Sequence, residues 1–471
     1  MALLLRKEWF GGLVGDPHTY NLRVLNHFAF NQIAAEISCG KALSANTMSM
    51  LRAAGLAVNV GELPTIIRIQ TDESDALPLS APVIFWLELT SRCPLRCKHC
   101  FIRPSINDKS KHLPTQLAMS LVRQAREMGI YKVTLTGGEA LLHPDAYEII
   151  GEINGLGLGL RIFSSGVLKP SFYQRLAEYR VDTFFLSMDG MKEHHQFIRG
   201  RKSFEQLTRT IDMLSAIRSI SNITLSITLD RMNAEYVDEI VSFASAHRVR
   251  TLLVRPIMAY AWTPDVSGFA FTDKSALLNA LETLESVGKQ YGVECQINKL
   301  PYFPFAKNTF IDDHENNASL WNILGIERSI DCVGGNLVCG VRWDGTISPC
   351  GFLPSHQQTT PSAPKVAVDL SGEWRNSPLL RGMRDIPANQ DCNSCAVQPI
   401  CNGGCRANSM LAGTGIDGID PYCLLHDTAY GHSVYGDHGR VDGENFPANE
   451  DVFFVSHKNL VSKCGWATYE F

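Results

Sequence analysis

Six strand-like segments, each followed by a helix-like segment, run from residue 83 to residue 290 and constrain the fold of this chain more than any other feature. The strand-like segments cover residues 83–90, 132–135, 160–164, 183–187, 223–230 and 251–257. The helix-like segments cover residues 114–128, 145–154, 172–179, 204–215, 235–247 and 275–290. This alternation predicts an α/β fold with a parallel sheet covered by helices. Because a closed barrel of this kind needs eight units, we expect a partial, TIM-like (β/α)6 barrel that binds ligands at the carboxyl ends of its strands.

The sequence on either side of this alternation predicts further domains, as expected for a chain of 471 residues. Residues 1–80 predict a small unit with a hairpin of strands at 10–14 and 20–25, a helix from Asn26 to Ser38 and a short helix at 44–54. An acidic linker at 71–79 joins this unit to the barrel domain, residues 83–300. A domain rich in cysteine, glycine and proline follows at 301–430, and residues 431–471 form a tail that is a candidate cover for the active site.

Composition and charge narrow the class of protein. The apolar fraction of 45% and the charged fraction of 19% are ordinary for a globular chain. With 43 basic and 48 acidic residues the net charge is −5, which argues against nucleic acid as the main partner. The sequence contains no run of about 18 apolar residues, so it predicts no membrane span. The apolar run at the N-terminus is too short for a signal peptide. We therefore expect a cytoplasmic protein with no membrane and no nucleic-acid partner.

Fourteen cysteines are many for such a chain, and eleven of them fall into two groups. In a reducing compartment, clustered thiols indicate metal binding or catalysis more often than disulfides. The other three, Cys39, Cys295 and Cys464, stand apart and are expected to be free thiols.

The first group, Cys93, Cys97 and Cys100, lies in the loop after the first predicted barrel strand. Three thiolates on a short loop can hold three irons of a cubane cluster and leave the fourth iron open for a substrate or cofactor. The spacing also suits a zinc knuckle with His99 as the fourth ligand. Spacing alone leaves both interpretations open.

The second group contains eight thiols in the cysteine-rich region, namely Cys332, Cys339, Cys350, Cys392, Cys395, Cys401, Cys405 and Cys423. Eight thiolates are enough for two fully ligated [4Fe–4S] clusters. They are also enough for two structural zinc sites, so the count by itself does not identify the metal.

The fragment LTSRCPLRCKHCF at residues 89–101 resembles the radical S-adenosylmethionine (SAM) superfamily, which has a C-x3-C-x2-C loop after its first barrel strand. The resemblance implies that Cys93, Cys97 and Cys100 are catalytic and hold a [4Fe–4S] cluster that binds SAM at the open iron. It also implies reductive cleavage of SAM to methionine and a 5′-deoxyadenosyl radical, which removes a hydrogen atom from the substrate.

Other strand ends resemble the SAM-binding motifs of that superfamily. Gly137, Gly138 and Glu139 follow the second strand, and the resemblance implies that Glu139 takes the methionyl amine. Ala140 departs from the pattern, because relatives usually have proline there. The resemblance also implies that Ser165 or Ser187 contacts the SAM carboxylate or ribose and that Arg199 pairs with the carboxylate. We expect Glu88 and Asp189 to face the same end of the barrel, which makes them candidates for a substrate base.

The second cysteine group resembles the SPASM extension of radical SAM peptide-modifying enzymes and anaerobic sulfatase maturases. The resemblance implies two auxiliary [4Fe–4S] clusters with interleaved ligands, three clusters in all. Cys332, Cys339, Cys350 and Cys405 would hold the nearer one, and Cys392, Cys395, Cys401 and Cys423 the farther one. Their implied role is electron transfer after substrate oxidation, and a purely structural role is the alternative.

The fragment EWFGGLVGDPHTYNLRVLN at residues 8–26 resembles the PqqD-like, winged-helix leader-binding element of ribosomal peptide pathways. Such an element adds the leader of a precursor peptide as an extra strand beside its hairpin. The resemblance therefore implies a maturase that oxidatively modifies a precursor peptide, through carbon–carbon or carbon–sulfur cross-links, with a flavodoxin or ferredoxin as electron donor. A formylglycine-type sulfatase maturase and a zinc-stabilised peptide-binding scaffold are the alternatives, and iron analysis separates the scaffold from the enzymes.

Overall fold

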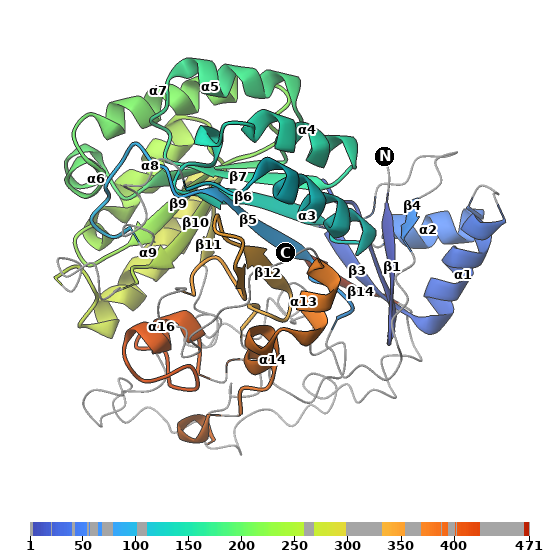
Figure 1. Ribbon diagram of the computed structural model, residues 1–471. Helices are drawn as coiled ribbons and strands as arrows, with labels where there is room; N and C mark the ends of the chain where they lie inside the picture. The colour runs from blue at the N-terminus through green and yellow to red at the C-terminus, as the bar shows by residue number, and fades with distance from the viewer. Residues whose placement is uncertain are drawn as a thin grey trace.

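The computed structural model contains two β-sheets with helices packed on them (Figure 1). The structure describes residues 3–19, 21–39, 43–53, 56, 65–67, 79–100, 111–258, 268–297, 332–353, 369–387, 389–393, 401, 403–423 and 466–470. The predicted linker, apart from Leu79, and the thiols of Cys395 and Cys464 lie outside these residues. Within them, no helix is both long enough and apolar enough to cross a membrane.

The larger sheet is built on six parallel strands that neighbour one another in chain order, which confirms the predicted α/β core. These strands are β5 (Ile84–Thr90), β6 (Lys132–Gly137), β7 (Gly159–Ser164), β8 (Thr183–Met188), β9 (Ile223–Leu229) and β10 (Thr251–Pro256). The helices that cover the sheet in Figure 1 are α3 (Thr115–Glu127), α4 (Ala146–Gly155), α5 (Pro170–Gln174), α6 (Lys192–Arg199), α7 (Ser203–Ser215), α8 (Val237–Ala246) and α9 (Lys274–Tyr291).

The core of this domain lies between the sheet and its helices. Alternate side chains of a strand point to the same face, and in β5 the helix-facing set of Phe85, Leu87 and Leu89 is fully buried. These side chains pack in one cluster with Leu121 and Val122 of α3. The opposite face of each strand is free to line the interior of the barrel, where polar side chains can meet a ligand.

Three short strands extend this sheet beyond the six that were predicted. β11 (Glu294–Ile297) pairs in parallel with β10 at one edge. At the other edge, β12 (Val338–Val341) pairs in parallel with β5, and β13 (Ile347–Ser348) pairs with β12 in antiparallel fashion. The cysteine-rich region thus adds a hairpin directly to the barrel sheet, next to the strand that leads into the three-cysteine loop.

Two predicted details of the barrel are wrong. The single helix predicted at 172–179 is α5 followed by a 3-10 turn, Arg175–Glu178. Helix α6 was not predicted, because its buried side chains are His195, Ile198 and Arg199. One apolar residue among the three makes no apolar stripe that sequence periodicity can detect.

The smaller sheet belongs to the N-terminal unit. The antiparallel pairing of β2 (Gly11–Gly15) and β3 (Asn21–Asn26) confirms the predicted hairpin, and Asn26 caps α1 (His27–Ser38) by accepting a hydrogen bond from Ala29 N at 2.8 Å. Three strands were not predicted, namely β1 (Leu4–Glu8), β4 (Thr65–Ile67) and β14 (Trp466–Glu470). Helix α2 (Ala45–Ala53) completes the unit.

The N-terminal sheet packs against the amino ends of the barrel strands. Leu4, Leu13 and Val24 share an apolar cluster with Val83 and Tyr131, which lie just before β5 and β6. β1 was not predicted, because three of the five residues in its sequence LLRKE are charged. Two of these residues, Arg6 and Glu8, are nevertheless fully buried in this interface.

Hydrogen bonds from this buried pair cross the interface. Arg6 Nη1 donates to the carbonyl oxygens of Pro82 and Gly129 at 3.0 and 3.1 Å. Glu8 pairs with Arg6 at 2.7 Å and accepts hydrogen bonds from the backbone and hydroxyl of Ser80.

The described residues of the cysteine-rich region include three α-helices and make several contacts with the barrel. The helices are α13 (Leu370–Asn376), α14 (Pro378–Arg384) and α16 (Arg406–Leu411). Trp374 of α13 is fully buried, and its Nε1 donates a hydrogen bond to Leu79 O at 3.0 Å. Tyr422 Oη donates to Ile257 O at 2.7 Å, just beyond β10. The region therefore contacts both ends of the strand series.

Candidate active site

One large cavity lies at the carboxyl ends of the barrel strands. It holds about 930 Å³ of space free of protein atoms, part of it open to solvent. Eight of the predicted site residues line it, namely Cys93, Cys97, Cys100, Gly137, Gly138, Ser165, Ser187 and Arg199. Because these residues come from the ends of four neighbouring strands and the segments after them, the sheet itself brings the predicted motifs together.

Backbone contacts fix the position of the three-cysteine loop. Gly138 N donates to Thr90 O and Glu139 N donates to Arg92 O, both at 2.7 Å. A Cβ on Gly137 would lie 2.2 Å from Thr90 O, and one on Gly138 would lie 2.3 Å from Arg92 O. The two glycines are therefore needed so that the end of β6 can lie directly against the segment that leads into Cys93.

Glu139 is fully buried beside the cavity, and its two carboxylate oxygens differ in their hydrogen-bond partners. Its Oε2 accepts hydrogen bonds from Ser165 N at 2.9 Å, Ser165 Oγ at 2.6 Å and Ser164 Oγ at 3.1 Å. Its Oε1 is buried and has no hydrogen-bond partner in the described part of the chain. Burial raises the pKa of Glu139, and the serine hydrogen bonds offset this only in part. A cationic group in the cavity would supply the missing partner for Oε1 and stabilise the carboxylate.

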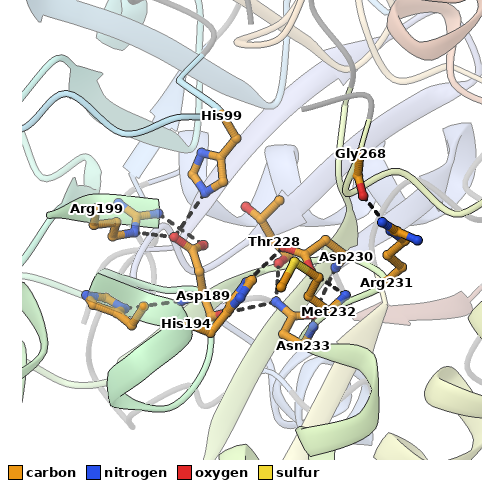
Figure 2. A network of polar contacts seen from close by, with 11 residues as sticks. His99, Asp189, His194, Arg199, Thr228, Asp230, Arg231, Met232, Asn233 and Gly268 are labelled. Carbon is orange, nitrogen blue, oxygen red and sulfur yellow. Dashed lines mark hydrogen bonds and ion pairs between the residues drawn. The ribbon is translucent and has the colours of Figure 1, made fainter. Parts of the chain in front are cut away.

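Arg199 forms an ion pair inside the protein, with Asp189 at the end of β8 (Figure 2). Its guanidinium donates to both carboxylate oxygens of Asp189, with 3.3 Å between Nη2 and Oδ1, and its Nη1 lies 3.8 Å from Cys97 Sγ. His99 Nε2 lies 2.9 Å from the same carboxylate. Although burial alone would raise the pKa of Asp189, Arg199 and His99 hold it well below its usual range. Asp189 therefore stays ionised and ties the cysteine loop to β8.

A second polar group beside this pair was missed from the sequence (Figure 2). Asn233 Nδ2 donates to the carbonyl oxygens of Asp189 and Thr228, both at 2.8 Å, and so joins the ends of β8 and β9. Asp230 accepts hydrogen bonds from the backbone of Met232 and Asn233, and His194 Nε2 lies 2.9 Å from its carboxylate. The only local signal is a D-x-x-N turn after a strand, which is too common to indicate a functional site.

The thiols of the loop are in an environment that suits metal ligation. Burial raises the pKa of Cys93 and of Cys97, and the charge of Glu139 raises that of Cys93 further. Such thiols become thiolates when a metal binds them. In the described residues, no three His, Cys, Asp or Glu side chains converge on the position of a single ion. The case for a cluster site here rests on the shared cavity and the loop that carries the three thiols.

A smaller cavity adjoins the first and contains Glu88. It holds about 320 Å³, and its lining includes Glu88, Gly137, Arg342 and Cys350, so it connects the barrel to the cysteine-rich hairpin. Glu88 Oε2 lies 3.6 Å from Arg342 Nη1, and its buried Oε1 has no hydrogen-bond partner among the described residues. Burial raises the pKa of Glu88 to about 7. Glu88 can therefore exchange a proton near neutral pH, unlike Asp189.

The thiols of the second group fall into packed groups. Cys332, Cys350 and Cys405 contribute to one apolar cluster with Met258 and Met383. Cys392, Cys401 and Cys423 belong to the main core together with Tyr422. Asp420 is fully buried and accepts a hydrogen bond from Cys405 N at 2.9 Å and from Tyr422 N at 2.9 Å. This carboxylate joins the segment of Cys405 to that of Cys423.

Residues 87–244 match the sequence model of the Radical SAM superfamily. This match covers the three-cysteine loop, Gly137–Glu139, Asp189 and Arg199. The chain contains a radical SAM domain. It is therefore an enzyme built around a radical SAM barrel.

Curated relatives match most of the chain at low identity. The mycofactocin maturase MftC of Mycobacterium tuberculosis is 25% identical over 348 residues, which cover 74% of this chain and 84% of that protein. The PqqA peptide cyclase of Rhizobium meliloti is 24% identical over 351 residues, covering 73% of this chain and 87% of that protein.

Solved structures share the fold of this chain, over 90% of it in one case and 73% in another. Streptococcus suis SuiB, bound to the precursor peptide SuiA, superposes with a TM-score of 0.68 over 90% of this chain and 98% of its own, at 17% identity. Native anSMEcpe, with bound AdoMet and Cp18Cys peptide, superposes with a TM-score of 0.55 over 73% of this chain and 94% of its own, at 16% identity. These likenesses concern the fold alone.

Radical SAM domains work with SAM and a [4Fe–4S] cluster, and the residues at this cavity fit both groups. Cys93, Cys97 and Cys100 provide three thiols on one wall of the cavity. Glu139 Oε1 is a buried acceptor without a partner in the described residues, which is what an ammonium group requires. Arg199 is less available than the sequence suggested, because Asp189 already occupies its guanidinium.

Proposed function

We propose that this enzyme reductively cleaves SAM at a cluster held by Cys93, Cys97 and Cys100 and uses the radical to modify a ribosomally made precursor peptide. The observation that carries this proposal is that the three thiols line one cavity of a radical SAM domain, with Glu139 buried beside it against Ser165 of the cavity wall. Relatives that are named a maturase and a peptide cyclase support a peptide as the substrate.

The proposed roles of the residues follow from their contacts. Oε1 of Glu139, which has no hydrogen-bond partner among the described residues, accepts a hydrogen bond from the methionyl ammonium of SAM, while Ser164 and Ser165 hold the other oxygen in place. Gly137 and Gly138 leave room for this arrangement, and Ser187 on the cavity wall contacts the carboxylate or ribose of SAM. A [4Fe–4S] cluster held by Cys93, Cys97 and Cys100 would supply the electron that breaks a carbon–sulfur bond of SAM.

We assign Arg199 two tasks. Its pairing with Asp189 holds the guanidinium close to Cys97, where its positive charge favours the thiolate form. Because Arg199 lines the cavity and a guanidinium has five N–H donors, it can also bind the carboxylate of SAM. We propose that Asp189 holds Arg199 in position and does not act as a base, because its pKa is held low. Glu88 is then the proposed acceptor of a substrate proton.

We further propose that the cysteine-rich region is a SPASM domain with two auxiliary [4Fe–4S] clusters. Three of the four thiols assigned to the nearer cluster, Cys332, Cys350 and Cys405, pack together although they are up to 73 positions apart. Cys350 also borders the cavity that holds Glu88. This position supports a path for the electron that an oxidised peptide gives up. Of the farther set, Cys395 lies outside the described residues.

A two-electron oxidation of the peptide needs an acceptor, and auxiliary clusters provide one. This favours a carbon–carbon or carbon–sulfur cross-link as the product. We propose a flavodoxin or ferredoxin as the donor of the first electron and the cytoplasm as the compartment, because iron–sulfur clusters persist under reducing conditions. The N-terminal unit, with its antiparallel hairpin and helices, is proposed as the PqqD-like domain that binds the leader.

The decisive experiment is anaerobic reconstitution with iron and sulfide, followed by incubation with SAM and dithionite and detection of 5′-deoxyadenosine by mass spectrometry. We expect about twelve irons per chain for three cubane clusters and formation of 5′-deoxyadenosine. A protein that binds zinc, takes up no iron and gives no such product would instead be the peptide-binding scaffold.

A triple variant sharpens this test. Replacing Cys93, Cys97 and Cys100 by alanine should remove about a third of the iron and all SAM cleavage. Cys295→Ala is the matched control, because this thiol stands apart from both groups. Formation of 5′-deoxyadenosine by the triple variant would contradict the assignment of the loop.

A further inference from the structure

The two ends of the chain meet in the N-terminal sheet. β14, residues Trp466–Glu470, pairs in antiparallel fashion with β3, with Trp466 opposite Leu25 and Glu470 opposite Asn21 (Figure 1). Five residue pairs form this ladder. The described part of the predicted tail therefore lies on the N-terminal sheet, at the amino ends of the barrel strands, and not over the active site.

β14 closes an edge that the proposed function requires to be open. In the sheet order β14-β3-β2-β1-β4, the three-stranded unit of β1, β2 and β3 has a partner on each side. β4 pairs with β1 in parallel, and β14 pairs with β3. A peptide that adds a strand to this unit must therefore take the place of one of these two partners, because a strand edge pairs with one neighbour at a time.

β14 is the partner that can leave at low cost. Residues 424–465 separate β14 from Cys423, the described residue before it, so the release of β14 leaves the other described elements in place. β4 is joined to the chain on both sides, between α2 and β5, so its release would shift connections to folded elements. The edge of β3 is thus the exchangeable one.

Exposed aromatic side chains lie at the end of β3 where β14 begins. Phe28, in the first turn of α1, is 76% exposed, and Trp9, in the turn between β1 and β2, is 38% exposed. Gly11 pairs with Asn26, which brings both aromatics to the end of the sheet beside Leu25. In an antiparallel peptide that begins to pair opposite Leu25, the residues before the paired stretch lie at this end of the sheet. Such a peptide can therefore also cover the rings of Phe28 and Trp9.

We propose that β14 is a built-in placeholder strand and that the leader of the precursor peptide binds by replacing β14 on the edge of β3. This inference rests on the proposed function in one respect, namely that the incoming strand is the leader of a precursor peptide. The partner it fits is an extended peptide that pairs antiparallel to β3 over about five residues and carries an apolar side chain just before that stretch.

The tether makes β14 a strong competitor. A segment of the same chain competes with an effective concentration in the millimolar range, so a free peptide of the same intrinsic affinity binds weakly to the intact enzyme. A leader succeeds because it can make contacts beyond the five pairs of β14, for example with Phe28 and Trp9. The N-terminal sheet is then protected from unrelated extended peptides when no precursor is present.

The test uses the full-length chain with and without a competent β14. The variant Ala467→Pro/Thr468→Pro removes two successive backbone N–H groups. Because alternate residues of an antiparallel strand bond to the same neighbour, at least one of these N–H groups donates to β3. Ala467→Ser/Thr468→Val is the matched control, because it keeps both donors. The probe is a fluorescent peptide with the sequence of residues 460–471 and serine in place of Cys464, and its binding is followed by fluorescence anisotropy.

We expect the proline variant to bind the probe at least about tenfold more tightly than the wild type and the matched control, because the intramolecular competitor is gone. Equal affinity in all three proteins, or no binding by any of them, would overturn the proposal. SAM cleavage by the proline variant shows that its barrel is folded.

A second measurement uses the wild-type chain and a precursor peptide. Hydrogen exchange of the fragment that contains residues 466–470 should rise when the precursor is added, while β3 stays protected by its new partner. A precursor that is modified by the enzyme but leaves this exchange unchanged would overturn the placeholder role. Failure of the proposed function is separate, since it appears as an absence of 5′-deoxyadenosine.

Discussion

At the scale of single residues, Glu139 shows how the fold positions a buried carboxylate oxygen for a cationic partner. Three donors from Ser164 and Ser165 saturate one oxygen, and the other is buried without a partner in the described residues. A buried carboxylate in this state is unfavourable until a cation arrives. A cationic ligand would offset the cost of burying it, so we expect the residue to select a positively charged group.

Glu139→Gln should therefore weaken SAM binding by at least about tenfold, because the amide keeps the shape of the side chain and loses the charge that pairs with the ammonium. Iron content should not change. Equilibrium dialysis with labelled SAM on the reconstituted enzyme measures the affinity. Ser164→Ala is the control, since it removes one supporting hydrogen bond and keeps the charge, and an equal loss in both variants would contradict the assignment.

Gly138→Ala should disturb the three-cysteine loop. The new Cβ would lie 2.3 Å from Arg92 O, so the backbone of the loop or of β6 must shift. We expect the variant to lose most of the SAM-binding cluster, measured as about a third less iron, together with SAM cleavage. Gly155→Ala is the matched control, because no atom lies within 4 Å of its Cβ position. Full iron content in Gly138→Ala would show that the loop tolerates the shift.

At the scale of elements, the contacts between the N-terminal sheet and the barrel strands carry a pH dependence. Lys132 begins β6, is nearly fully buried and donates a hydrogen bond from Nζ to Pro17 O at 2.9 Å. Burial lowers the pKa of Lys132 to about 8. The lysine is held by a carbonyl oxygen, with Asp182 and Asp16 as the nearby charges that favour its protonated form.

The sign of the effect follows from the two pKa values. The folded chain loses the Lys132 proton near pH 8, whereas the unfolded chain keeps it to about pH 10.4. The unfolding free energy should therefore rise with pH across this window, at about 1.4 kcal/mol per unit from this residue. Lys132→Met should lack the rise, and the exposed Lys169→Met should keep it. Urea unfolding at several pH values between about 7.5 and 10 measures both, and identical pH profiles for all three proteins would contradict the prediction.

At the scale of the whole molecule, the sequence predicted what is encoded locally. Helical and strand periodicity gave the six βα units, and the spacing of Cys93, Cys97 and Cys100 predicted a site that the comparisons support as a radical SAM domain. Pairings between distant segments were missed. β12 pairs with β5 although about 250 residues separate them, and β14 pairs with β3.

The local sequence of a short strand does not indicate which distant strand it pairs with, because its apolar periodicity is the same for any neighbour. The same limit applies within the site. The sequence marked Arg199 as a ligand contact, but only the fold shows that Asp189 already holds it.

The arrangement of the domains sets a minimum length for the substrate. The edge of β3 lies on the side of the amino ends of the barrel strands, and the cavity with the three thiols lies at the carboxyl ends. β5 has seven residues, so the sheet is about 23 Å deep at about 3.3 Å per residue. An extended chain covers at most about 3.6 Å per residue. A peptide held at β3 thus needs at least about seven residues between its bound strand and the residue that is modified.

Precursor variants with fewer than about seven residues in this linker should bind the enzyme with unchanged affinity and remain unmodified. Variants lengthened by glycine and serine should be modified, because a flexible chain loses little by added length. Mass spectrometry of the peptide and fluorescence anisotropy separate modification from binding. Normal modification of a precursor with a linker of about four residues would mean that leader and core bind on the same side of the barrel, and the assignment of the N-terminal sheet as the leader site would then be wrong.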